Sequence, residues 1–367
     1  MPDMHIVRMQ KPDGRWLTLY GRHPVVVASG VRTPAVRALA PNPHLRWHPL
    51  RAEWVAYAAY RQDRTHLPPA EHNPLLPSSN ETEPTELPEG QYDVAVFDNL
   101  FPTLIQTASD PPTLAIPTAP ARGQCEVVVF TQDPSASLGK LELTHLELLI
   151  EVWADRTERL GGLASVQYVL PFENRGVAVG VTLNHPHGQI YAYPFVPPVA
   201  ARVNEQERTF YERQGQALLQ TLIDSEIQQG TRVLYCGEHA VSFVPPWARY
   251  PYEVWVAPRR AVAFLHEITA AERTDLGLAL KMSLLKLDGL WGMPMPYVMA
   301  WFQAPTDGAH HPEAHVHAEF YPAQRTRNKI KFLAGTEVAA GMFASDSMPE
   351  DCARELREVP VHESALR

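Results

Sequence analysis

Two histidines and a glutamine stand at alternate positions in NHPHGQI, residues 184–190. Because successive side chains of a strand point to opposite faces, His185, His187 and Gln189 would share one face of a strand. A neutral imidazole can bind a metal, act as a base or attack as a nucleophile. Three buried polar side chains without partners would be costly. The motif therefore indicates a metal clip, a catalytic device or hydrogen-bonded histidines at a sheet edge.

The first half of the chain combines strands with one long helix. Residues 66–90 are rich in Pro, Glu, Ser and Thr, which predicts a long solvated loop. A helix after Ser137 is predicted by apolar residues at three- and four-residue steps: Leu143, Leu146, Leu149, Ile150 and Trp153. Strand-like runs of β-branched and apolar residues occupy 51–60, 92–97, 125–130 and 176–183, and the last run leads into the motif.

The second half repeats this order. We predict one helix over 203–229 ending at Gly230, and a second over 269–291 in which Thr269 and Glu272 form a capping box. Strands are predicted at 232–236, 240–244, 252–257, 297–302 and 315–322, the last carrying His315 and His317. The repeated order predicts an internal duplication, with halves at 1–198 and 199–367. The absence of βαβ regularity favours an α+β fold.

Composition favours a cytoplasmic protein with neither nucleic-acid nor membrane partners. The 367 residues carry a formal net charge of -9, and no lysine- and arginine-rich run stands out. Cys125, Cys236 and Cys352 lie far apart without a CxxC pair, so neither a disulfide framework nor a cysteine zinc clip is indicated. The first residues lack the apolar core of a signal peptide, and no apolar run reaches the length of a membrane span.

The stretch FENRGVAVGVTLNHPHGQIYAYPF (172–195) resembles the active-site segment of galactose-1-phosphate uridylyltransferases, members of the histidine-triad superfamily. The resemblance implies a duplicated histidine-triad-like fold with a mostly antiparallel sheet and flanking helices. It implies that His187 attacks the α-phosphorus of a UDP-sugar and forms a covalent uridylyl-histidine. The carbonyl of His185 would hold the proton on the other ring nitrogen. Gln189 stands where related hydrolases often have a third histidine. Its neutral amide can hold phosphoryl oxygens without supplying an acid, which favours transfer over hydrolysis.

The resemblance covers most of the chain and implies further site residues. Nucleotide and phosphate binding is implied for Arg61, Arg64, Asn99, Phe101, Asn174, Gly180 and Thr182. Sugar binding is implied for Lys331, Phe332 and Glu337 in KFLAGTE (331–337), so both halves would contribute to the site. In the family the arginine region reaches across a dimer interface, which implies a homodimer. Without the resemblance, the charged residues would be ordinary surface charges and the asparagines turn or corner residues.

The resemblance predicts no bound metal, because the family's ligand positions have changed. Many members carry a zinc ion held by a CxxC pair, a further histidine and the first histidine of HPH. The CxxC positions fall at Leu76 and Ser79, and the further histidine falls near Pro134. Only His185 then remains, and one imidazole cannot make a structural zinc site.

A second family metal site, made of a glutamate and three histidines, also looks dismantled. Its glutamate falls near Val203, and its histidines fall at Phe302, His317 and Glu319. The stretch AHHPEAHVH (309–317) keeps a histidine metal-binding module open as an alternative, although it lacks clear carboxylate or cysteine partners.

The resemblance thus implies a transferase that exchanges UMP between UDP-glucose and galactose 1-phosphate by a ping-pong mechanism. Its partners would be UDP-glucose, UDP-galactose and a hexose 1-phosphate. Two alternatives to this function stay open: a related nucleotidyltransferase with a different nucleotide or acceptor, and a non-catalytic protein that binds nucleotide sugars.

Overall fold

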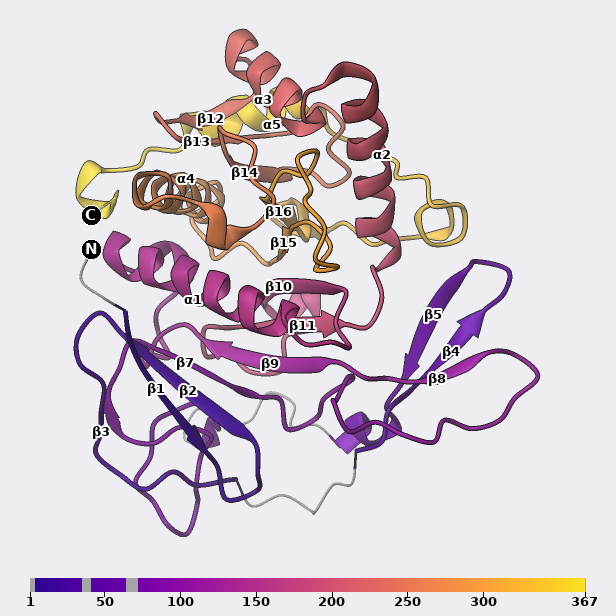
Figure 1. Cartoon of the computed structure of the whole chain (residues 1–367). Coiled ribbons are helices and arrows are strands. Elements are labelled where there is room, and N and C mark those ends of the chain that lie inside the picture. Colours follow the sequence, from indigo (N-terminus) through magenta and orange to yellow (C-terminus); the bar gives the residue numbers. More distant parts are fainter. Residues whose placement is uncertain (1–3, 35–40, 64–71, 367) are drawn as a thin grey trace.

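The centre of the molecule is an eleven-stranded antiparallel sheet with the strand order β1-β2-β7-β9-β11-β10-β15-β16-β14-β13-β12 (Figure 1). The structure, a computed structural model, describes residues 4–34, 41–63 and 72–366. The strands are β1 (His5–Gln10), β2 (Trp16–Gly21), β7 (Val94–Asp98), β9 (Gln124–Val129), β10 (Tyr168–Arg175), β11 (His187–Tyr193), β12 (Val233–Cys236), β13 (Ala240–Phe243), β14 (Val254–Pro258), β15 (Tyr297–Phe302) and β16 (His317–Pro322).

Five α-helices and three small sheets within the described residues surround this sheet. The helices are α1 (Leu143–Gly161), α2 (Pro198–Gln214), α3 (Leu218–Gln229), α4 (Ala270–Gly289) and α5 (Pro349–Glu358). The small sheets pair β3 (Val26–Val27) with β6 (Gly90–Gln91), β4 (His44–His48) with β5 (Glu53–Tyr57) and β8 (Thr118–Pro120), and β17 (Gln324–Thr326) with β18 (Lys329–Ile330). The predicted α+β class, with a large antiparallel sheet and flanking helices, is confirmed. None of the described helices is long and apolar enough to cross a membrane.

The central sheet contains two equivalent units. In the first, the chain runs through β9, α1, β10 and β11, and β11 lies between β9 and β10. In the second, it runs through β14, α4, β15 and β16, and β16 lies between β14 and β15. The units meet where β10 pairs with β15. Each His-x-His motif therefore stands at the same place in its unit, although the boundary between residues 198 and 199 stays a prediction.

Helices α1 and α4 pack together over one face of the sheet (Figure 1). Their shared core includes Trp153 of α1 and Trp301 of β15, whose ring centroids lie 5.8 Å apart. Ile190 and Ala192 of β11 point into this core and are fully buried. Because side chains alternate along a strand, the odd-numbered residues of β11 face away from α1. This leaves one face of β11 available for a site.

Two of the predicted elements are wrong, and glycine explains both. Residues 176–183 form turns around a short 3₁₀ segment (Val177–Val179), because Gly176 and Gly180 adopt φ values of 90° and 79°. The helix predicted over 203–229 is two helices, since Gly215 (φ 68°) ends α2 in the left-handed conformation. By contrast, α3 ends at Gly230 as predicted, and the capping box of Thr269 and Glu272 at the start of α4 is confirmed.

Candidate active site

The first three residues of strand β11 determine where the side chains of the motif point. His187 and Gln189 point away from the core, while Gly188 packs into it. A Cβ on Gly188 would lie 2.8 Å from the Phe130 ring and 2.7 Å from the carbonyl oxygen of Phe172, so only glycine fits there. His185 precedes the strand, in a bend. The predicted strand alternation therefore holds for His187 and Gln189 alone.

The ring of His187 is neutral and is held by one hydrogen bond. Its Nδ1 lies 2.7 Å from the backbone carbonyl oxygen of His185, so Nδ1–H donates and Nε2 keeps its lone pair. Within the described residues, Nε2 has no hydrogen-bond partner, and the ring lines a cavity. Burial lowers the pKa of His187 below its usual value of 6.5. The imidazole is thus unprotonated at neutral pH, with its free nitrogen available.

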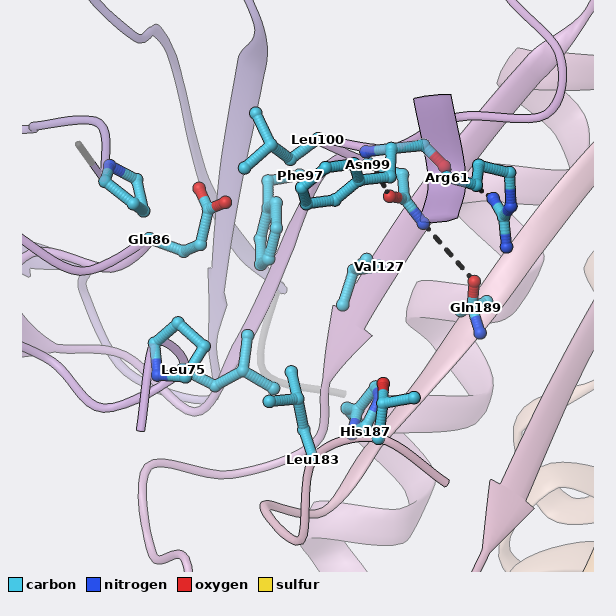
Figure 2. A pocket seen from close by; sticks show the side chains of 14 residues that line it. Arg61, Leu75, Glu86, Phe97, Asn99, Leu100, Val127, Leu183, His187 and Gln189 are labelled. Carbon is cyan, nitrogen blue, oxygen red and sulfur yellow. Dashed lines mark hydrogen bonds between the residues drawn. The ribbon is translucent and has the colours of Figure 1, made fainter. Parts of the chain in front are cut away.

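The cavity beside His187 combines apolar walls with polar groups at two sides, with Arg61, Asn99 and Gln189 on one side and Glu86 on the other (Figure 2). Gln189 lies opposite Val127 of β9, and Val127 lies opposite Phe97 of β7, so these three form one row across the sheet. The lining includes the predicted residues Arg61, Asn99, Phe101, Thr182, His187 and Gln189. The structure therefore brings together six predicted residues from separate parts of the first half.

Asn99 orients the amide of Gln189. The Asn99 side-chain oxygen accepts a hydrogen bond from the backbone N–H of Phe101 at 2.8 Å, which fixes the direction of its own amide group. Its Nδ2 then donates to Oε1 of Gln189 at 3.3 Å. The amide nitrogen of Gln189 consequently lies on the side away from Asn99 (Figure 2). Gln189 thus presents an N–H donor to the cavity.

A second cavity meets the first at His187. It is lined by residues of β10, by the segment before β11 and by Pro294–Pro296 of the second half. The predicted residue Asn174 and the catalytic candidates His185 and His187 are among its lining residues. The His187 ring therefore stands between two spaces that can each hold part of a substrate. Gly180 lies on the exposed turn between β10 and β11, outside the lining of both cavities.

The predicted sugar-binding residues do not join this site within one chain. Among the described residues that line the two cavities, none is Lys331, Phe332 or Glu337. Nζ of Lys331 donates to the Ala344 carbonyl at 2.7 Å and lies 3.5 Å from a Glu337 carboxylate oxygen. Both charged side chains therefore make contacts within their own loop. Phe332 is 76% exposed. Arg64 lies outside the described residues, whereas Arg61 lines the cavity of its own chain.

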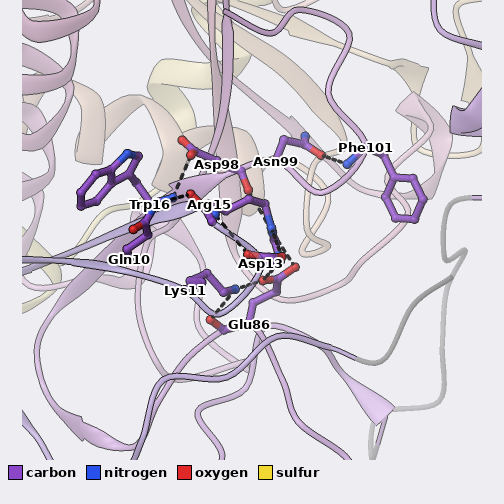
Figure 3. A network of polar contacts seen from close by, with 10 residues as sticks. Gln10, Lys11, Asp13, Arg15, Trp16, Glu86, Asp98, Asn99 and Phe101 are labelled. Atoms are coloured by element: carbon purple, nitrogen blue, oxygen red, sulfur yellow. Dashed lines mark hydrogen bonds and ion pairs between the residues drawn. The ribbon is translucent and has the colours of Figure 1, made fainter. Parts of the chain in front are cut away.

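The sequence did not point to Glu86, a carboxylate at the end of the first cavity away from His187 (Figure 2). Glu86 is buried and is held by Lys11 and by two hydrogen bonds from Arg15, at 3.0 and 3.1 Å (Figure 3). Leu75 and Leu87 of the same segment are also buried. Pro74, Leu75 and Glu86 therefore form part of the cavity wall, so the prediction of a solvated loop over 66–90 is wrong for these residues, while residues 79–83 are exposed as predicted. The apolar residues Leu75 and Leu87 were the sequence feature that could have indicated burial of this segment.

The histidine pair of the second half repeats the hydrogen bond from the ring to the backbone, but the ring of its second histidine is covered by other side chains. Nδ1 of His317 lies 2.8 Å from the carbonyl oxygen of His315, as in the first half. However, Nε2 of His317 lies 3.1 Å from Glu319, and the rings of Trp255 and Phe302 stack on its two faces, at 4.8 and 5.5 Å. A ring with both nitrogens engaged and both faces covered cannot reach a substrate.

The two histidines that remain at the family's metal-ligand positions, His185 and His317, have hydrogen-bond partners on both ring nitrogens. Both nitrogens of His185 are engaged, Nε2 with the Thr131 carbonyl at 2.7 Å and Nδ1 with Asn73 at 3.1 Å. Both nitrogens of His317 are also engaged, Nδ1 with the His315 carbonyl at 2.8 Å and Nε2 with Glu319 at 3.1 Å. In the ranges that the structure describes, no group of three or more His, Cys, Asp or Glu side chains is placed to hold a metal ion.

Comparison with known proteins agrees with this geometry. Residues 38–197 match the N-terminal domain of galactose-1-phosphate uridyl transferase, and residues 203–366 match its C-terminal domain. The galactose-1-phosphate uridylyltransferase of Thermotoga maritima is 37% identical over 327 residues, 86% of this chain and 98% of that protein. The Streptomyces lividans enzyme is 35% identical over 368 residues, 96% and 97% of the two chains. A solved uridylyltransferase structure matches with a TM-score of 0.76 at 29% identity, covering 88% of this chain and 98% of that one. The chain belongs to the galactose-1-phosphate uridylyltransferase family.

Proposed function

We propose that this protein transfers UMP between UDP-glucose and galactose 1-phosphate through a covalent uridylyl-histidine on His187. The observation that carries the proposal is the open Nε2 of His187 between two cavities, with Nδ1–H held by the His185 carbonyl. Family membership supports the same reaction, because the relatives are named for it.

In the first half-reaction, Nε2 of His187 attacks the α-phosphorus of UDP-glucose. A P–N bond forms, the P–O bond to the β-phosphate breaks, and glucose 1-phosphate leaves with the bonding electrons. The positive charge that develops on the ring is stabilised through Nδ1–H by the His185 carbonyl dipole. The Gln189 amide and the Arg61 guanidinium line the same cavity and supply donors for the phosphoryl oxygens.

In the second half-reaction, the phosphate of galactose 1-phosphate attacks the same phosphorus from the side of the leaving group. The P–N bond breaks, its electron pair returns to Nε2, and UDP-galactose is released. The two steps use the same groups in reverse, so no acid or base other than the ring is required. The products therefore leave in ping-pong order.

The two cavities divide the substrate between them. The first offers Phe97, Phe101 and Leu75 as apolar walls for the base, with the Glu86 carboxylate as an acceptor for a nucleoside donor. The second, which contains Asn174, takes the sugar phosphate side of the reaction. His187, which lines both, stands at the phosphorus between them.

The proposal includes a metal-free, cytoplasmic homodimer. The ligand positions described above favour the absence of zinc and of the second family metal. Exposed apolar side chains beside Lys331, namely Phe332, Leu333 and Val338, favour a partner surface there. In a homodimer this loop would contribute to the site of the second copy, because it does not reach the cavities of its own chain. Light scattering at several concentrations tests the dimer, and a monomer throughout would contradict it.

A nucleotide panel tests the reaction itself. We expect the protein to convert UDP-glucose and galactose 1-phosphate into UDP-galactose and glucose 1-phosphate, and to convert ADP-glucose much more slowly. Chromatography of the products measures both. Faster turnover of ADP-glucose would favour the related nucleotidyltransferase, and tight binding of UDP-glucose without products would favour a binding protein.

The first half-reaction should stay fast in mildly acidic solution. Burial lowers the pKa of His187 below 6.5, and only the neutral ring attacks. The rate of uridylylation should therefore fall with decreasing pH only below the ordinary histidine value. Rapid-quench measurement of adduct formation between pH 5 and 8 gives this profile. An acid limb centred above 6.5 would contradict the burial of the ring.

A further inference from the structure

In the described part of the segment that would carry zinc ligands, a side-chain hydrogen bond reaches the active-site motif. Nδ2 of Asn73 lies 3.1 Å from Nδ1 of His185. Since Nε2 of His185 donates to the Thr131 carbonyl at 2.7 Å, its Nδ1 is unprotonated and accepts from the amide. A metal-bound histidine has the same arrangement, with one ring N–H on a carbonyl and the other nitrogen on the metal. In this chain the amide stands where the metal would be.

The local backbone fixes Asn73 in this position. Its side-chain oxygen accepts from the N–H of Leu75 at 3.0 Å, so the amide nitrogen must face His185. The N–H of Leu76 donates to the Asn73 carbonyl at 3.3 Å and closes a turn over residues 73–76. Asn73 and Leu76 therefore have the spacing of a CxxC pair on one turn. Ser79, which the sequence alignment placed at the second cysteine, is exposed and bonded to Glu89 instead.

We propose that Asn73 is a positioning residue that replaces the metal with a hydrogen bond. One end of its side chain holds His185, whose carbonyl orients the His187 ring. The other end holds the turn that presents Leu75 to the first cavity. Asn73 thus joins the wall of the cavity to the nucleophile, as a shared metal ion would. The link to catalysis rests on the proposed function, whereas the structural link does not.

The Asn73→Asp variant isolates this contact. Aspartate keeps the size of the side chain and the acceptor for Leu75 N–H, but it offers no donor to the neutral His185 ring. The measurements are made at about pH 8.5, so that the ring stays neutral and does not donate to the carboxylate instead. We expect the thermal midpoint to fall by a few degrees. We also expect kcat to fall about 10- to 100-fold, as when an outer partner of a site histidine is lost. KM for UDP-glucose should stay within about threefold, because no substrate contact is removed. Asn73→Ala should lower the midpoint further, since it also removes the Leu75 contact.

A second variant tests the position without any readout of turnover. Asn73→Cys combined with Leu76→Cys should create a site of two thiolates and the free Nδ1 of His185, and should bind about one zinc ion per chain. Leu76→Cys alone should retain none after dialysis. Metal analysis of protein purified with added zinc measures both.

The outcomes separate this proposal from the proposed function. A zinc-free double variant, or an Asn73→Asp protein with the midpoint and kcat of the original chain, would overturn the role of Asn73. If the protein showed no uridylyl transfer at all, the thermal and zinc measurements would still decide whether Asn73 stands in a ligand position.

Discussion

The His187→Gly variant is expected to form no uridylyl adduct and to lose turnover by about 10⁴-fold or more, the scale of removing a covalent nucleophile. The reason lies in the geometry: Nε2 of His187 is open to the cavity, while Nε2 of its counterpart His317 is engaged by Glu319. Among the described residues, no other imidazole nitrogen of the motif is free, because His185 has both ring nitrogens in hydrogen bonds. Intact mass after mixing with UDP-glucose alone measures the adduct.

His317→Asn is the matched control for this experiment. It changes the equivalent histidine of the second half, and we expect the adduct to form at a normal level even where the thermal midpoint is lower. An acid-labile adduct on His187→Gly protein would contradict the assignment of His187 as the nucleophile. An adduct that is lost in His317→Asn but kept in His187→Gly would place the nucleophile in the second half. No adduct on the unmodified protein under trapping conditions would contradict the covalent mechanism altogether.

The active face of β11 could be predicted because strand periodicity is local. His187, Gly188 and Gln189 alternate between cavity and core as the sequence indicates, and the capping box at Thr269 depends only on residues within one turn. The same local patterns failed to predict where glycines turn the chain. The apolar run 176–183 has the composition of a strand, yet Gly176 and Gly180 turn the chain twice. Composition does not reveal which glycines adopt positive φ.

The distant end of the cavity could not be predicted because its contacts are long-range. Glu86 binds Lys11 and Arg15 across separations of 75 and 71 residues, and no local pattern links them. Both cations belong to the segment before residue 38, where the match to the family begins. Similarly, the resemblance indicated Lys331 and Glu337 but not that they lie outside the cavities of their own chain.

The two equivalent histidine pairs differ in their access to a cavity. Both histidine pairs use the same backbone bond, from Nδ1 to the carbonyl two residues earlier. The difference lies in the neighbours of the ring. Trp255 of β14 and Phe302 of β15 stack on the His317 ring and Glu319 engages its Nε2, whereas His187 lines a cavity. The same backbone bond therefore occurs both in a histidine that lines a cavity and in a core histidine, and the two rings differ in the side chains around them.

Gln189→Ala is expected to lower kcat by about 10²- to 10³-fold, the cost of removing one fixed donor from a developing anionic oxygen. The Gln189 amide is fixed in advance by Asn99, so its N–H group needs no reorganisation as charge builds on the phosphoryl oxygens. UDP-glucose should still bind with similar affinity, because the apolar walls and Arg61 remain. Single-turnover rates and equilibrium titration separate these two effects. Full turnover in Gln189→Ala would remove the role assigned to this residue.

Gln189→His extends the same experiment to the choice between transfer and hydrolysis. Histidine at this position can carry a proton and activate water, which the neutral amide cannot do. We therefore expect the uridylylated variant to release UMP to water faster than the original protein when galactose 1-phosphate is absent. Gln189→Asn serves as the control, since it keeps a neutral amide and should not accelerate hydrolysis. Equal hydrolysis in both variants would show that access of water, rather than the chemistry of residue 189, protects the intermediate.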